Sequence, residues 1–301
     1  MENKTLEWLL EDSNPAIKYR TLTEICGEQP DSCRAVYNSI WEQKPVERMF
    51  SKQDENGLWA NDSYEYLSAC AELGLHKDER LDNYVNFIVK SMTDFLDNND
   101  EDFGCRAPLM LRALVMMGYH EKSDVKKLIT RCAATQLYDG GFNCQRLLKK
   151  NPGRKSCYKA ALQGLLLYAE CKRKNILPAN ADKLLDYFLK RDIFYSSDRT
   201  KNFKDGRADK GWRFIDNFFP AEPLRTGLPL IISSLSVLGA GNHPALTEAW
   251  ELLKAKKYEN GRMKLDGTLS KFPYNFGAVG KENKWVTFYA ALAEKFLRGG
   301  N

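Results

Sequence analysis

The stretch QLYDGGFNC, residues 136–144, lies between two apolar segments whose hydrophobic residues recur at helical spacing. Two adjacent glycines break that spacing, and an aromatic residue and a cysteine follow them at once. A glycine-rich, aromatic stretch recurs roughly every 40 to 65 residues, which is the signature of stacked copies of one supersecondary unit. The other copies are QDENGLWAND (53–62), DNNDEDFGCR (97–106), NFKDGRADKGWRF (202–214) and YENGRMKLDG (258–267).

The segments between these stretches read as helices. Their apolar residues recur at three- and four-residue spacing, and the sustained period-two alternation of strands is nearly absent. Pro, Gly and Asx punctuation divides the chain into about twelve helices in six pairs. Pro223 and Pro229 leave the start of one helix uncertain by several residues. The predicted helices span 3–11, 15–26, 31–50, 62–74, 78–96, 105–118, 122–136, 156–172, 179–192, 222–238, 243–257 and 285–298.

Two kinds of connection alternate along the chain. The second helix of a pair ends in a short turn, in which Gly74, Gly118 and Gly239 suit the left-handed position that closes a helix. The long aromatic connection leads into the next such helix. Helix pairs with unequal connections close naturally into two concentric rings, with the inner helices all beginning at one mouth. The sequence therefore predicts an all-α protein, an (α/α)6 toroid formed by a single domain over residues 1–301.

Composition limits the function classes. The chain has 301 residues, of which 43% are hydrophobic, enough for one large core. It has no apolar run long enough to span a membrane, and its first residues lack the order of a signal peptide, so a cytoplasmic location is expected. The eight cysteines are scattered and give no disulfide framework. Acidic residues interrupt the basic ones throughout, so the net charge of +5 argues against a nucleic-acid partner and leaves room for a local anion site.

Some of these stretches resemble the repeats of a known superfamily. Gln53 with Gly57-Leu58-Trp59 resembles the glutamine–tryptophan repeats of squalene and terpenoid cyclases. Gln136 with Asp139-Gly140-Gly141-Phe142 is also similar to the glycine–glycine–phenylalanine turns of protein prenyltransferase β subunits. The resemblance runs along most of the chain and looks closest to single-domain bacterial squalene-cyclase-like proteins. It implies the toroid fold and an isoprenoid or similar apolar ligand in a central cavity, with no defined reaction.

The chain departs from both catalytic patterns of that superfamily. In Asp100-Glu101-Asp102-Phe103, Phe103 stands where the acid motif of the cyclases ends in aspartate, although Asp102 remains a candidate acid. Cys157 matches the ligand cysteine of the prenyltransferase zinc site, but Lys155 replaces its aspartate and the segment 284–293 has no histidine. The first expectation is an enzyme of terpenoid-cyclase or prenyltransferase type that acts on this ligand. The departures support the alternative of a non-catalytic ligand-binding or scaffold protein with the same fold.

Three cysteines form a separate hypothesis. Cys105, Cys144 and Cys157 each lie at or just before the start of a predicted inner helix. The helix dipole and neighbouring basic residues lower the pKa of a thiol there. Three thiolates with water or Asp102 would make a tetrahedral zinc site with an open position, so a zinc-dependent enzyme is a further alternative. The simpler interpretation is that cysteine is a small residue used where helices pack tightly.

Basic and aromatic residues near the predicted mouth supply the ligand-binding candidates. Helix starts and arginines would hold an anionic head group such as a diphosphate, and aromatic faces would line the apolar tail. The simpler interpretations are solvated cations and core aromatics. A sugar-acting toroid would instead need two opposed carboxylates from among Glu65, Asp102 and Glu222. A second subunit that completes the site stays open. The candidate ligand-binding residues are Trp59, Arg106, Phe142, Arg154, Lys155, Tyr158, Trp212, Arg213, Arg225, Trp285 and Tyr289.

Overall fold

A computed structural model describes residues 3–60, 64–99, 104–143, 150–151, 153–196, 198–200 and 214–297. Over these residues the chain forms 13 α-helices and no strand, which confirms the all-α prediction. No helix of this described part has both the length and the apolar character needed to cross a membrane. The helices are α1 (Asn3–Leu9), α2 (Pro15–Arg20), α3 (Arg34–Trp41), α4 (Lys44–Phe50), α5 (Tyr64–Glu72), α6 (Glu79–Asn99), α7 (Arg106–Met116), α8 (Ser123–Ala134), α10 (Tyr158–Arg173), α11 (Ala181–Leu189), α12 (Leu228–Val237), α13 (Thr247–Ala255) and α14 (Lys284–Leu297).

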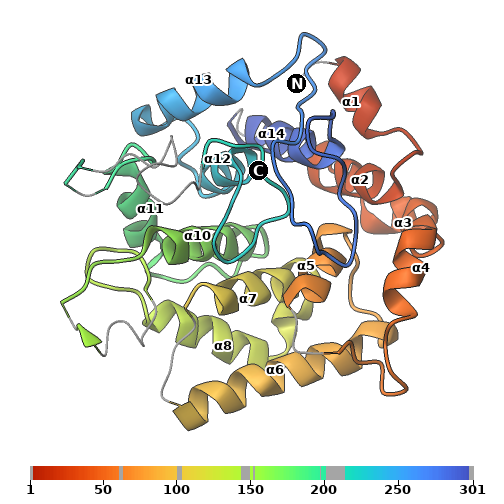
Figure 1. Ribbon diagram of the computed structural model, residues 1–301, viewed down its shortest axis with the longest axis horizontal. Coiled ribbons are helices and arrows are strands. Elements are labelled where there is room, and N and C mark those ends of the chain that lie inside the picture. The colour runs from red at the N-terminus through yellow and green to blue at the C-terminus, as the bar shows by residue number, and fades with distance from the viewer. Residues whose placement is uncertain are drawn as a thin grey trace.

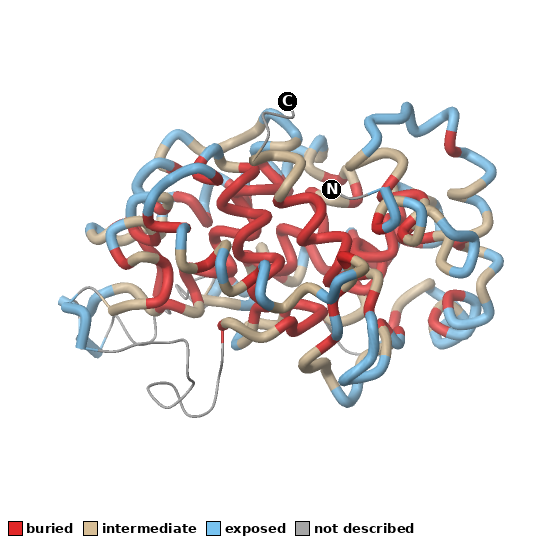
Figure 2. Tube along the Cα trace, turned by 90° about the horizontal axis from the view of Figure 1, so that it is seen from above, coloured by how far each residue is buried: buried red, intermediate tan, exposed pale blue. Residues whose placement is uncertain are grey.

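Alternate helices lie inside and outside. In Figure 1, α5, α7, α10, α12 and α14 occupy the middle of the molecule, and α3, α4, α6, α8, α11 and α13 lie around them. The inner helices pack on one another in chain order: α5 on α7, α7 on α10, α10 on α12, and α12 on α14. All residues of α12 are buried, as expected of a helix that is apolar on every side. Figure 2 shows the same division, with buried chain in the interior and exposed chain at the periphery.

Several predicted helix boundaries need correction. The segment 31–50 is two helices, because Pro45 lies in the first turn of α4 and cannot continue α3. The helix predicted over 222–238 begins only at Leu228, with Pro229 in its first turn. The segment 15–26 is helical throughout, but its second half is the π-helical turn η1 (Thr21–Cys26). The three predicted helix-closing glycines are confirmed: all have left-handed φ angles, 76° at Gly74, 86° at Gly118 and 93° at Gly239.

The turn at 136–142 is built from one set of hydrogen bonds. Gln136 Nε2 donates to the carbonyl of Gly140 over 2.7 Å, and the amide of Leu137 donates to the carbonyl of Gly141 over 2.9 Å. Gly140 has a φ of 91°, and a Cβ there would lie 2.2 Å from the carbonyl oxygen of Lys183 in α11. The glycine is therefore required twice, by its backbone conformation and by the close approach of the next outer helix.

The same turn occurs at two other places. Gln53 Nε2 donates to the carbonyl of Gly57 over 2.9 Å, as Gln136 does to Gly140. The amide of Tyr258 donates to the carbonyl of Arg262 over 2.9 Å, in the place of the bond from Leu137. The repeat in the sequence is thus a repeated backbone turn that precedes an inner helix.

Each of these turns also contacts an outer helix. Gln53 donates a second bond, of 3.0 Å, to the carbonyl of Arg80 in α6. Gly140 touches α11, as described above. The third turn contacts α1, where Thr5 Oγ1 donates to the carbonyl of Asn260 over 3.3 Å and the guanidinium of Arg262 lies 4.5 Å from the ring centre of Trp8.

Two glycine substitutions separate the contact from the conformation. Gly239 has nearly the same φ as Gly140, but a Cβ there would meet nothing within 4 Å. We expect Gly239→Ala to lower the free energy of unfolding by about 1 kcal/mol, the usual cost of a left-handed residue with a Cβ. We expect Gly140→Ala to cost about 2 kcal/mol more, because α11 must also move away. Urea unfolding of both variants measures this, and equal losses would show that the contact with Lys183 is unimportant.

Candidate functional site

Polar side chains gather where the inner helices begin. We call Tyr64, Arg106, Glu222 and Arg225 the helix-start cluster. The guanidinium carbon of Arg106, the first residue of α7, lies 5.5 Å from the ring centre of Tyr64, the first residue of α5. Arg225 Nε is paired with the carboxylate of Glu222, and its guanidinium carbon lies 4.5 Å from the ring centre of Phe218. Two cations therefore rest on aromatic faces in this cluster, an arrangement that is attractive in itself.

The phenol of Tyr64 connects the two halves of the cluster. Burial raises the pKa of this hydroxyl, and the negative charges of Glu65 and Glu222 raise it further, while Arg106 partly opposes them. The hydroxyl is therefore protonated at neutral pH and acts as a hydrogen-bond donor. Glu65, which accepts a hydrogen bond from the phenol, and Glu222, whose charge acts on it, are two of the three carboxylates considered for a sugar-acting site.

Arg106 is the exposed cation of this cluster. Its guanidinium has no ion-pair partner among the residues that the structure describes. It lies at the amino end of α7, where the unpaired amides and the helix dipole also favour negative charge. This end of the molecule is therefore suited to an anion.

The loop before α12 carries the other half of the cluster and is held by α10. Gln163 Nε2 donates to the carbonyl of Glu222 over 2.9 Å and to Thr226 Oγ1 over 3.1 Å. The amide of Glu222 donates to the carbonyl of Arg225 over 2.9 Å, which closes a turn. These bonds fix Glu222 and Arg225 relative to α10.

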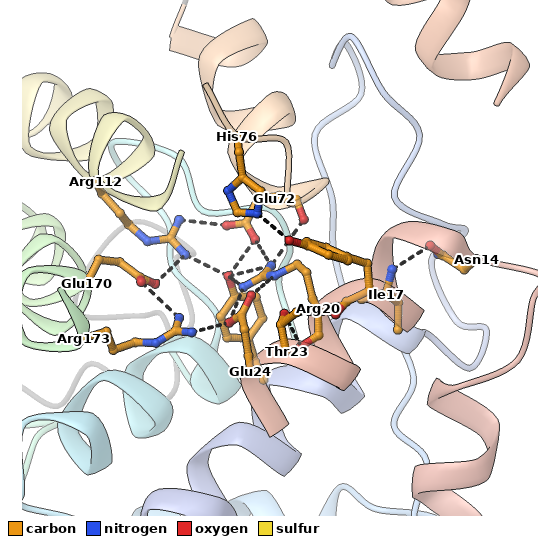
Figure 3. A network of polar contacts seen from close by, with 12 residues as sticks. Asn14, Ile17, Arg20, Thr23, Glu24, Glu72, His76, Arg112, Glu170 and Arg173 are labelled. Carbon is orange, nitrogen blue, oxygen red and sulfur yellow. Dashed lines mark hydrogen bonds and ion pairs between the residues drawn. The ribbon is translucent and has the colours of Figure 1, made fainter. Parts of the chain in front are cut away.

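A second polar cluster lies toward the far ends of the same helices. We call Arg20, Glu24, Glu72, Arg112, Glu170, Arg173 and Tyr289 the ion network (Figure 3). Its centre is the carboxylate of Glu72, at the end of α5. This carboxylate accepts three hydrogen bonds: from Arg20 over 2.9 Å, from Arg112 over 2.7 Å and from the hydroxyl of Tyr289 over 2.6 Å. These four side chains are at most 4% exposed.

The rest of the ion network balances its charge. Glu24 accepts from Arg20 over 2.6 Å and lies 2.7 Å from Arg173. Glu170 is 3.0 Å from Arg173 and 3.9 Å from Arg112. Burial raises the pKa of Glu24, but the charges of Arg173 and Arg20 outweigh this and lower it to about 2. Three arginines thus face three carboxylates, so the charges of the ion network balance one another without a ligand.

Four predicted aromatic residues are packing residues in the structure. Trp59 Nε1 donates to the carbonyl of Met49 over 2.8 Å, and its ring stacks on Tyr66 with 4.7 Å between centres. The other three are also buried by neighbouring helices. Phe142 packs edge-on against Tyr168, Tyr158 donates to the carbonyl of Ile193 over 2.6 Å, and Trp285 stacks on Phe219.

The remaining candidates divide into three groups. Arg106 and Arg225 belong to the helix-start cluster, and Tyr289 belongs to the ion network. Arg154 and Lys155 are exposed in the connection before α10. Asp102, Cys144, Trp212 and Arg213 lie outside the described residues.

The cysteine hypothesis is only partly visible. Cys105 and Cys157 are the residues immediately before α7 and α10, as predicted. Within the described ranges no group of three or more His, Cys, Asp and Glu side chains could hold a metal ion. Because Cys144 lies outside those ranges, zinc at the three cysteines stays a prediction. The cysteines that are described are all free thiols.

A pocket of about 680 Å³ lies elsewhere, between α13, the turn after it and α14. Trp250, Lys254, Tyr258 and Ala291 are among its lining residues. None of the described candidate residues lines it, so it gives no support to the predicted ligand site.

Sequence reasoning missed most of the ion network. Glu72 and Arg112 lie in segments that are otherwise apolar, LSACAELGL and APLMLRALVMM. A charged residue in such a segment must be paired when the helix is buried on all sides. That signal was present in the sequence, although it could not identify the partners.

Comparison of the chain with known protein families, with curated proteins and with solved structures finds no match. The resemblance to squalene and terpenoid cyclases therefore rests on the motifs quoted above.

The depressed pKa of Glu24 makes stability depend on pH. The carboxyl has an ordinary pKa of 4.5 and a folded value of about 2, so its ion pairs stabilise the protein fully above pH 4.5 and progressively less down to pH 2. The linkage amounts to about 3 kcal/mol. We expect Glu24→Gln to be less stable at pH 7 and to lose less stability between pH 5 and 3 than the wild type. Urea unfolding at each pH measures the free energy of unfolding, and the exposed Glu47→Gln is the control. If Glu24→Gln loses as much stability between pH 5 and 3 as the wild type does, this role of Glu24 is refuted.

Proposed function

We propose that the helices close into the (α/α)6 toroid predicted from the sequence, as one domain. The inner helices contact one another in chain order, and α14 also contacts α2 and η1. Arg20 of α2 in turn binds Glu72 of α5, over 2.9 Å. In a closed ring each inner segment has two inner neighbours. The contacts above give two such neighbours to each of the six segments α2, α5, α7, α10, α12 and α14.

The outer helices support the same proposal. The turns at 53–58 and 136–141 each contact the next outer helix in the chain, which is α6 for the first and α11 for the second. The turn at 258–262 contacts α1 through Thr5 and Trp8. In a closed ring the next outer helix after this last turn is the first helix of the chain, α1, and that is the helix it contacts.

We propose that the helix-start cluster binds a small molecule with an anionic group and an apolar body, of the isoprenoid type. The observation that carries this proposal is Arg106, an exposed cation at the start of α7 that lies over the ring of Tyr64 and has no ion-pair partner among the described residues. Arg106, at the amino end of α7, would bind the anion.

The alternative is a binding protein of the same fold without catalysis. One observation favours it over an enzyme: the charged side chains of the ion network around Glu72 are already paired with one another. A zinc-dependent enzyme using Cys105, Cys144 and Cys157 is the further alternative. Metal analysis of untagged protein tests it, since stoichiometric zinc would support it and metal-free protein would remove it.

Thermal unfolding with farnesyl diphosphate tests the binding proposal. A ligand that binds only the folded chain raises Tm, and at a hundred times its Kd it adds about 2.7 kcal/mol. We expect this shift with the wild type, and at least a tenfold weaker affinity for Arg106→Gln, because a hydrogen bond to a charged group contributes about 1.5–3 kcal/mol.

The matched control is Arg34→Gln, which removes an exposed arginine from the outer helix α3. It should keep the full shift. Farnesol, which lacks the anion, should bind much more weakly than the diphosphate. If the diphosphate gives no shift with the wild type, or the same shift with Arg106→Gln, the proposed site is wrong.

A further inference from the structure

The pocket of about 680 Å³ between α13 and α14 is separate from both polar clusters, because no described residue of either cluster lines it. Its walls come from α1, α13, the segment 257–261 and α14. Four of its lining residues are both buried and small, and their size leaves the space open. They are Thr5, Gly261, Thr287 and Ala291. The volume is that of a site for a small molecule.

One side of the pocket carries a cation and an anion in contact. The ammonium group of Lys257 is paired with the carboxylate of Glu294, and both residues line the pocket. Their side chains are 23% and 19% exposed, so each remains partly accessible. The pair offers a hydrogen-bond donor and an acceptor side by side. Two neighbouring hydroxyl groups match this arrangement, because each hydroxyl can both donate and accept.

The charges of the described lining residues balance one another. Lys254 and Glu259 are exposed at the edge of the pocket, and Lys257 and Glu294 lie further in. Two positive charges thus face two negative ones. The pocket differs in this respect from the helix-start cluster, where Arg106 favours an anion. A neutral polar ligand therefore suits the pocket better than an ion does.

Two aromatic side chains give the pocket apolar surface. Trp250 Nε1 donates to the carbonyl of Gly241 over 2.9 Å, which fixes the indole where it lines the pocket. Tyr258 lines it as well and is 44% exposed. Tyr and Trp suit ligands that are apolar on one side and polar on another. A sugar ring is such a ligand, because it has a face of C–H groups and a rim of hydroxyls.

We propose that this pocket binds a neutral sugar of one or two rings. A face of the sugar packs on Trp250 and Tyr258, and neighbouring hydroxyls form hydrogen bonds with Lys257 and Glu294. The binding is non-covalent, and no bond is made or broken. The inference is independent of the proposed anion site, since the two sites share no residue.

Calorimetry with cellobiose and maltose, two neutral disaccharides that differ in their linkage, tests the proposal. We expect at least one of them to bind the wild type with a Kd of about 1 mM or lower. Tyr258→Ala should raise this Kd about fivefold, because the contact with an exposed ring is lost while the fold is kept. Ala291→Leu should abolish binding, because the larger side chain fills the buried side of the pocket.

Two variants serve as controls. Tyr138→Ala removes an aromatic residue that is 74% exposed in another aromatic turn, and it should leave the Kd for the disaccharide unchanged. Arg106→Gln should also leave it unchanged, although the same variant weakens the binding of farnesyl diphosphate. The result for the sugar site can therefore be separated from the result for the anion site.

Three results would overturn the inference. The first is that neither disaccharide binds the wild type. The second is that binding is unchanged in both Tyr258→Ala and folded Ala291→Leu, because the sugar would then lie elsewhere. The third is that inorganic phosphate displaces the disaccharide, which would make the pocket an anion site. None of these results would alter the test of the helix-start cluster with farnesyl diphosphate.

Discussion

The carboxylate of Glu72 is the point at which four helices meet. It accepts hydrogen bonds from Arg20 of α2, Arg112 of α7 and Tyr289 of α14, while Glu72 itself ends α5. A buried charge is costly unless it is paired, so these contacts favour one register of the four helices relative to one another. The ion network also commits the far ends of the inner helices to structure. The proposed ligand site lies at the other end, where the helices begin.

The aromatic turns connect the inner helices to the outer ones. The three described turns share one backbone hydrogen-bond pattern, and after the turns at 53–58 and 136–141 the next aromatic residue, Trp59 or Phe142, packs inward. In the first turn a glutamine reaches both the turn and the next outer helix. In the second, a glycine lets the backbone of α11 approach. Packing between the inner and outer helices thus explains the aromatic residues of the repeat. The described candidates for ligand binding are instead the cations Arg106 and Arg225, near the helix starts.

Local features of the fold could be predicted from the sequence, and distant pairings could not. Helical periodicity, the repeated turns and the closing glycines all depend on residues close together in the chain. The apolar periodicity continues across Pro45 and therefore predicted one helix. The proline ring interrupts the backbone hydrogen bonds, so the structure has two helices there. Arg106 and Arg225 were predicted as binding residues from their positions at helix starts. The pairing of Arg20 with Tyr289 joins residues 269 positions apart, and nothing in one sequence encodes that distance.

The depth of the ion network decides how the molecule responds to salt and heat. Dissolved ions screen exposed pairs such as Arg34 with Asp31, whose side chains are 72% and 88% exposed. They cannot enter between Arg112 and Glu72, which are 4% and 1% exposed. Heating reduces the cost of withdrawing charges from water, so buried pairs become relatively more favourable as temperature rises. Added salt therefore weakens the exposed ion pairs at the periphery and leaves the pairs that join the inner helices in place.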